Sequence, residues 1–255
     1  MTDLELYEEM VCLTRTGVPF VLATVVASSG SSPRKPGAKM LVRSDGSAIG
    51  TVGGGRVESE TIEAALQSLS SGEPITLEFV LTEENGFACG GRMSVFVEPR
   101  ESRPLVVMFG AGHVGRAVTR LAHDCGFRVV VVDERPECAV GQLLPGADEI
   151  HCCPVMDFFD RLTLERESSV IIATTGHLHD FAAVRGSLAT ESGFIGLLGS
   201  RRKREALMMA LTEEDYATGQ RERVISPVGL DIGAQTPEEI AVSIVAQLIK
   251  RKRQP

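Results

Sequence analysis

A chain of 255 residues with 43% hydrophobic and 24% charged residues is long enough for two moderate domains, each with its own core. Its net charge of −8 argues against a general nucleic-acid binder, and no apolar run approaches the ~20 residues of a membrane span. The acidic N-terminus is unlike a signal peptide, and the six cysteines show no CxxC spacing, which argues against a zinc site or a disulfide framework. We therefore expect a cytoplasmic protein with free thiols.

The first hundred residues predict a small α+β domain. Thr2 and Glu5 form a capping-box pattern that opens a helix. Asp45-Gly46 is typical of a tight β-hairpin turn. A second helical pattern covers residues 56–69. Apolar and alternating runs predict strands at residues 20–27, 40–43, 47–52, 75–81 and 93–98.

Two segments of this domain are candidate anion loops. Gly53-Gly54-Gly55 precedes the second helix, where its amides are either a phosphate cradle or part of a tight turn that needs positive φ. Glu58, in the first turn of that helix, would suit the helix dipole and repel an anion. Residues 28–37 carry hydroxyls and cations without periodicity, so they are either a connector or an anion site.

The segment Cys89-Gly90-Gly91 lies on a loop between the last two strands of the domain. Its glycines allow a ligand to approach closely, and a thiol on a loop is accessible to that ligand. The alternative is that Cys89 is a small hydrophobic residue, as a lone cysteine usually is. Sequence alone favours the alternative.

A dinucleotide-binding fingerprint opens the second half of the chain. Residues 105–109 predict a buried strand, and Gly110, Gly112 and Gly115 follow it in the spacing GxGxxG. A helical pattern and a second apolar run come next, and the run ends in Asp133, which would accept a hydrogen bond from a ribose hydroxyl. A charged, proline-bracketed segment precedes the fingerprint, so we expect domains at residues 1–100 and 101–255.

Strands alternate with helices through the rest of this domain. The order predicts a Rossmann-like, doubly wound parallel sheet, in which the first and fourth strands are neighbours. The expected helices after the fingerprint lie at residues 156–166 and 179–189, with a last one opening at 236–239. The expected strands are at residues 105–109, 129–132, 150–153, 169–174 and 194–198.

Three loops of this domain should converge, because ligands of such sheets bind outside the carboxyl ends of the strands. They are residues 110–115, 174–180 and 199–204. Taken alone, His177 and His179 would more often be surface residues. Residues 201–203 (Arg-Arg-Lys) are either a phosphate clamp or a solvated first turn, and cations at that place oppose the helix dipole.

Several separated segments together resemble the XdhC/CoxI family, whose members are maturation factors for molybdenum hydroxylases such as xanthine dehydrogenase. The segments include GTVGGGRVE, ACGG, FGAGHVGRA, GLLGSRRKR and SPVGLDIGAQTPEEIAVSI, and the resemblance covers nearly the whole chain. One segment departs from the family pattern. The usual family segment after the fourth strand is similar to T-H-D-H-x-x-D, whereas this chain has Thr175-Gly176-His177-Leu178-His179-Asp180 there.

The resemblance implies a protein that binds molybdenum cofactor, as molybdopterin alone or in a nucleotide form. It would assist sulfuration of the cofactor with a cysteine desulfurase and deliver it to an apo-hydroxylase. Cys89 would be the soft group near the metal or the incoming sulfur. We also expect a homodimer. The residues expected to bind the cofactor are Gly53, Gly54, Gly55, Cys89, Gly90, Gly91, Gly110, Gly112, His113, Gly115, Asp133, His179, Asp180, Arg201, Arg202 and Lys203.

Two functions from different classes follow. The first is a cofactor-binding chaperone without turnover of its own, which the resemblance favours. The second is an NAD(P)-dependent oxidoreductase, which the fingerprint and Asp133 support. Against the second, the sequence has no Tyr-x-x-x-Lys pair, and Tyr7 and Tyr216 are its only tyrosines.

Overall fold

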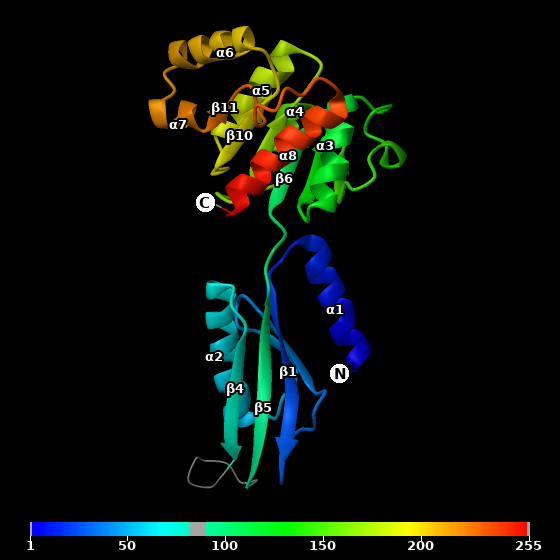
Figure 1. The fold of residues 1–255 in the computed structure, drawn as a ribbon, viewed down its shortest axis with the longest axis vertical. Coiled ribbons are helices and arrows are strands. Elements are labelled where there is room, and N and C mark those ends of the chain that lie inside the picture. Colours follow the sequence, from blue (N-terminus) through cyan, green and yellow to red (C-terminus); the bar gives the residue numbers. More distant parts are fainter. Residues whose placement is uncertain (1, 82–89, 254–255) are drawn as a thin grey trace. The chain divides into compact units, whose positions relative to one another are not determined.

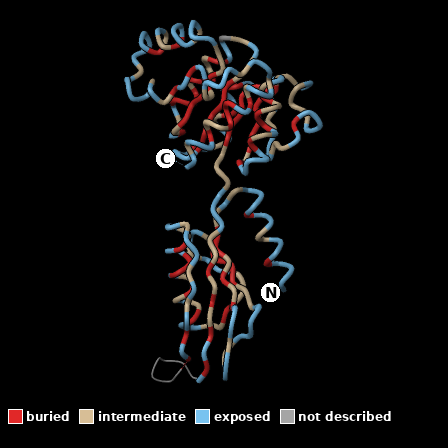
Figure 2. The backbone as a smooth tube through the Cα atoms, viewed as in Figure 1, coloured by how far each residue is buried: buried red, intermediate tan, exposed pale blue. Residues whose placement is uncertain are grey.

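The structure, a computed structural model, describes residues 2–81 and 90–253. It divides into two compact units, Met1–Ser102 and Arg103–Pro255, each with its own sheet. Buried residues gather on the strands of each sheet and on the helix faces turned toward them (Figure 2). Among the described helices none is long and apolar enough to cross a membrane.

The first unit is an antiparallel sheet with one helix on each face (Figure 1). Its strand order is β3-β2-β1-β5-β4. Alternate residues of a strand point to opposite faces, so Val21 and Ala23 of β1 pack under α2 while Phe20 packs under α1. The elements are α1 (Asp3–Thr16), β1 (Phe20–Ser29), β2 (Lys39–Arg43), β3 (Ala48–Gly50), α2 (Gly55–Ser71), β4 (Ile75–Leu81) and β5 (Gly91–Arg100).

The second unit is the predicted doubly wound α/β fold. All pairings in its sheet are parallel, and the strand order is β11-β10-β9-β6-β7-β8. The strands are β6 (Leu105–Phe109), β7 (Arg128–Val132), β8 (Glu149–His151), β9 (Ser169–Ile172), β10 (Phe194–Leu197) and β11 (Val224–Ile225). The helices are α3 (His113–Asp124), α4 (Val155–Phe158), α5 (His177–Leu188), α6 (Arg201–Glu213), α7 (Thr218–Glu222) and α8 (Pro237–Arg253), with a 3-10 turn at Gly141–Leu143.

Helices cover both faces of this sheet, which explains why its strands are continuous apolar runs. One face packs against α3 and α8 through Val118, Ala122 and Ile244. The other face packs against α5 and α6 through Val184 and Leu207. The strand order reverses between β6 and β9, which is the topological switch point of the sheet. From β6 the chain adds β7 and β8 on one side, and it then adds β9, β10 and β11 on the other side.

The chain after β8 differs most from expectation. The predicted helix at residues 156–166 is limited to the four residues of α4. Phe158 is fully buried edge-to-face against Phe109, with ring centroids 5.5 Å apart, and Leu164 reaches the same core from irregular backbone. Packing of these side chains, rather than helical periodicity, decides this segment. The sequence also missed α7 and β11, which are too short to show a period.

Candidate functional site

Two glycines of the fingerprint are required by the backbone itself. Gly110 has φ +105°, and a Cβ there would lie 2.3 Å from the carbonyl oxygen of Ala173, at the end of the neighbouring strand β9. A Cβ on Gly115 would lie 1.9 Å from the carbonyl oxygen of Gly110. The loop can therefore turn and pack this closely only without side chains at both positions.

The third glycine, Gly112, leaves the N-terminus of α3 open. It is the N-cap residue, no described side chain caps the helix there, and the first turn holds no acidic residue. A Cβ on Gly112 would meet no atom within 4 Å. The first-turn amides of α3 thus have no side-chain cap among the described residues, and with the positive end of the helix dipole they form an arrangement that binds a phosphate. The side chain of His113 is exposed and lines a separate hollow on the flank of α3, together with Arg116 and Arg120.

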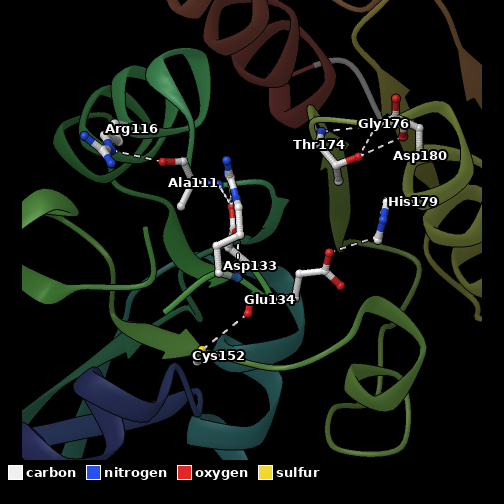
Figure 3. Close-up of polar contacts among 10 residues, drawn as sticks. Ala111, Arg116, Asp133, Glu134, Cys152, Thr174, Gly176, His179 and Asp180 are labelled. Carbon is white, nitrogen blue, oxygen red and sulfur yellow. Dashed lines mark hydrogen bonds and ion pairs between the residues drawn. The ribbon is translucent and has the colours of Figure 1, made fainter. Parts of the chain in front are cut away.

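Asp133, at the end of β7, is hydrogen-bonded entirely within the chain (Figure 3). One carboxylate oxygen accepts from the amide of Ala111 at 2.7 Å and from Nη2 of Arg135 at 2.7 Å. The other accepts from the amide of Arg135 at 3.0 Å and from its Nε at 2.9 Å. Burial opposes ionisation of this carboxyl, but the bonds from Arg135 and Ala111 outweigh it and lower its pKa below the ordinary 3.8. Asp133 therefore braces the glycine loop.

A second helix with a glycine N-cap, α5, begins on the other side of the topological switch point. Its N-cap is Gly176, again without a side-chain cap among the described residues. Asp180, which is 1% exposed, accepts from the amide and the hydroxyl of Thr174 at 3.1 and 2.7 Å and from the ammonium group of Lys203. Lys203 also donates to the carbonyl oxygen of Leu198 at 3.0 Å. This ion pair joins the first turns of α5 and α6, the helices that follow β9 and β10.

A small crevice lies outside the carboxyl ends of β6, β7 and β9. Nδ1 of His179 lies 3.5 Å from a carboxylate oxygen of Glu134, whose carbonyl oxygen accepts from the thiol of Cys152 at 3.9 Å (Figure 3). The lining residues are Gly110, Val132, Asp133, Glu134, Arg135, Val155, Thr174, Thr175 and His179.

The structure brings together only part of the predicted second-domain site. Gly110, Asp133 and His179 line the crevice, whereas Lys203 is engaged with Asp180. Arg201 and Arg202 are exposed on α6 and do not line it. Glu134, Arg135 and Val155 line the crevice but were not predicted from the sequence. Thr174 and Thr175 belong to a loop that was expected to converge here, although they were not among the residues expected to bind the cofactor. Arg135 was recognisable as a cation two residues after the strand-terminal aspartate, but the sequence did not show that the two side chains would pair.

The glycine loops of the first unit have partners of their own. The amide of Gly54 donates to Oε1 of Glu58 at 3.0 Å, and the hydroxyl of Thr51 donates to the same oxygen. The carboxylate that sequence analysis expected to repel an anion thus already occupies a position where an anion would bind. Binding of a ligand by Gly53, Gly54 and Gly55 stays a prediction.

The glycines of the first unit also allow three segments to pack closely at one end of its sheet. A Cβ on Gly91 would lie 2.2 Å from the carbonyl oxygen of Ser31, and one on Gly53 would lie 2.9 Å from Cγ of Pro33. Gly90, which precedes Gly91, has φ +72°. Cys89 lies outside the described residues. Among the residues that are described, no group of three His, Cys, Asp or Glu side chains is arranged to hold a metal ion.

Comparison with known proteins matches both units to one family. Residues 106–248 match the profile described as the XdhC Rossmann domain, and residues 13–80 match the profile of the XdhC and CoxI family. A solved structure described as a xanthine dehydrogenase from Bacillus halodurans is 27% identical, with a TM-score of 0.55, and the alignment covers 99% of this chain and 96% of that one.

Three curated relatives extend the comparison. An uncharacterised Escherichia coli K12 protein, YqeB, is 36% identical over 98% of this chain and 46% of its own length. A Bacillus subtilis 168 protein, named as a probable subunit of xanthine dehydrogenase, is 31% identical over 63% of this chain and 46% of its own. The molybdenum cofactor insertion chaperone PaoD of E. coli K12 is 21% identical over 91% of this chain and 83% of its own length. The chain spans about half the length of the first two relatives. It belongs to the XdhC/CoxI family.

Proposed function

We propose that this protein binds molybdenum cofactor and takes part in the maturation of a xanthine dehydrogenase-type hydroxylase. The observation that carries the proposal is the family match in both units, together with a relative named as an insertion chaperone for this cofactor. The finer steps, sulfuration with a cysteine desulfurase and delivery to one particular apo-hydroxylase, belong to the same proposal. So does a homodimeric state.

The residues at the carboxyl edge of the parallel sheet fit the phosphate that the pterin carries. The open N-terminus of α3, with Gly112 as its N-cap, offers amide donors to that phosphate. The hydroxyl groups of Thr174 and Thr175 and the imidazole of His179 lie along the crevice and would hydrogen-bond to polar atoms of the ligand. When bound, the cofactor supplies the molybdenum on which a hydroxylase performs its chemistry. In this proposal Cys89 is the thiol that acts on the metal or on sulfur.

The second candidate is an NAD(P)-dependent oxidoreductase, favoured by the same glycine loop. In such enzymes the strand-terminal acid accepts from the ribose of the dinucleotide. Here both oxygens of Asp133 are engaged by Arg135 and Ala111, which weighs against this use.

The test is retention of cofactor by the protein purified anaerobically from cells that make it. Pterin is measured by oxidation and fluorescence, and molybdenum by mass spectrometry, both per chain. We expect near-stoichiometric pterin in the wild type and little in Gly112→Asp, because the new carboxylate would cap the amides of α3 and repel a phosphate. The variant should fold, since the side chain enters open space.

Gly219→Asp is the matched control, because Gly219 also lies in the first turn of a helix and a Cβ there would meet no atom within 4 Å. It should retain pterin. Tight binding and turnover of NAD or NADP, with no pterin under any condition, would replace the proposal by the oxidoreductase. Cys89→Ser separates two roles of the thiol. If the variant holds pterin but a recipient hydroxylase is not sulfurated, Cys89 acts on sulfur rather than on affinity.

A further inference from the structure

The first turn of α6 carries four consecutive cations, and only one of them turns into the protein. Lys203 is 13% exposed and is bonded to Asp180 and to the carbonyl oxygen of Leu198. Arg201, Arg202 and Arg204 are exposed. Within the described part of the chain, the side chains of these three arginines form no ion pair, although Glu205 follows directly. The cluster is thus divided into an internal lysine and an outward triplet.

The outward triplet stands where positive charge is electrostatically unfavourable. A helix N-terminus carries the positive end of the helix dipole, and the first turn of α6 holds no acidic residue to compensate. The helix is held instead by the Ser200 cap on the amide of Lys203, at 3.3 Å, and by the buried Leu207 and Leu211. Nothing in the fold of α6 requires the three arginines. An external anionic partner would compensate their charge.

The geometry of the triplet suits an extended surface better than a single phosphate. Successive residues of a helix are about 100° apart around its axis, so Arg201 and Arg204 are neighbours on one side while Arg202 points to another. A phosphate clamp needs donors that converge on one point. Donors that fan out around a helix end match several carboxylates spread over a protein surface.

A large apolar side chain is exposed in the first turn of α5, the helix to which Lys203 is bonded. Leu178 is 85% exposed at the second position of α5. Asp180, two residues further along the same helix, pairs with Lys203 and so holds the first turns of α5 and α6 together. An exposed leucine and exposed arginines on two helix turns that are held together have the composition of an interface, in which an apolar anchor is combined with a charged rim.

We propose that Arg201, Arg202, Arg204 and Leu178 form a docking surface for an acidic patch on the recipient hydroxylase. This inference rests on the proposed function, because it takes the recipient of the cofactor as the partner. The arginines steer the encounter, and Leu178 prolongs the complex once it has formed.

The test compares two triple charge reversals of the full chain, each made at the end of a helix. The first is Arg201→Glu, Arg202→Glu and Arg204→Glu. It should fold, since acids suit a helix N-terminus. The control is Lys250→Glu, Lys252→Glu and Arg253→Glu, at three exposed cations of the last turn of α8. Association with a xanthine dehydrogenase apoenzyme is followed by stopped flow between low and high salt, and circular dichroism confirms the fold of each variant.

We expect the α6 reversal to slow association about tenfold or more at low salt and to abolish most of its salt dependence, since this rate rests on electrostatic steering. The control should lie near wild type, and Leu178→Ser should mainly speed dissociation. Equal effects of the two reversals would overturn the proposal, as would loss of bound pterin in the α6 reversal. If the wild type holds pterin but does not bind the apoenzyme, the docking surface is wrong while cofactor binding stands. If it holds no pterin, the proposed function itself fails.

Discussion

Replacing Asp133 by asparagine tests whether this residue braces the glycine loop. The side chain is only 4% exposed, and its two oxygens accept four hydrogen bonds, one from Ala111 and three from Arg135. Asparagine keeps the shape but removes the charge and turns an NH2 group toward two donors. A lost hydrogen bond to a charged group costs about 1.5–3 kcal/mol. A broken buried ion pair costs about 3–5 kcal/mol, and water reaching the 31% exposed Arg135 reduces that figure.

We therefore expect Asp133→Asn to lower the free energy of unfolding by about 2–3 kcal/mol at pH 7. The assay is urea unfolding of the full chain followed by circular dichroism, with Glu137→Gln as a control in the same loop. A difference within about 0.5 kcal/mol, the range of ordinary surface substitutions, would refute the brace.

The pH dependence gives a second measurement on the same pair of proteins. The pKa of Asp133 is lowered in the folded state, because its bonds to Arg135 and Ala111 outweigh burial. Its stabilising contribution is therefore complete above the ordinary pKa of 3.8 and is lost as the pH falls through the lower folded value. Asparagine does not titrate. The gap between wild type and variant should stay constant from neutral pH to about pH 5 and close only below 3.8. A gap that closes near neutral pH would assign it to another group.

Three further substitutions test other contacts. Gly115→Ala should destabilise by about 3 kcal/mol or more in thermal unfolding and also lower pterin retention, because its Cβ would lie 1.9 Å from the carbonyl oxygen of Gly110. Lys203→Met should cost about 3 kcal/mol in urea unfolding by leaving Asp180 charged and buried, and adding Asp180→Asn should recover most of it. Arg223→Ala should cost about 2 kcal/mol and speed amide exchange at the end of α5, since four carbonyl groups at and just after that end each lose one donor.

The glycine loop and the sheet order could be predicted because both follow from backbone sterics. A strand, a turn too tight for a side chain at Gly115 and a helix permit few arrangements, and the structure has the expected one. The partner of Asp133 could not be predicted in the same way. The pairing with Arg135 depends on how two side chains orient in a loop, and the pattern of residue types does not record that.

The same limit applies to the cations of α6. Residues 201–203 are all cations, so the sequence does not distinguish them. In the structure Lys203 reaches the buried Asp180, whereas Arg201 and Arg202 are exposed. Helical phase and the position of α5 decide this, and both are tertiary properties. Glu58 is the contrasting case. Its position in the first turn of the helix already argued from sequence against anion binding at the triple glycine. In the structure its carboxylate accepts a hydrogen bond from the amide of Gly54.

The N-terminal amides of the longer described helices carry the strongest argument for where a ligand binds. Three of these helices have a side-chain cap on such an amide: Thr2 serves α1, Ser200 serves α6 and Thr236 serves α8. At α2 the N-cap residue Gly54 has no side-chain cap, although its own amide donates to Glu58 in the first turn. The other two helices without a side-chain cap are α3 and α5, whose N-cap residues are Gly112 and Gly176. They follow β6 and β9, the neighbouring strands between which the strand order reverses.

The uncapped ends of α3 and α5 lie at the switch point of the sheet, where ligands of this fold bind. The uncapped N-terminus of α3, whose first turn holds no acidic residue, favours an anionic ligand over a neutral one. Free phosphate should therefore compete with the pterin for the wild-type protein. It should bind the Gly112→Asp variant at least tenfold more weakly in equilibrium dialysis, because the new carboxylate would take its place. Equal binding of phosphate by both proteins would place the anion site elsewhere.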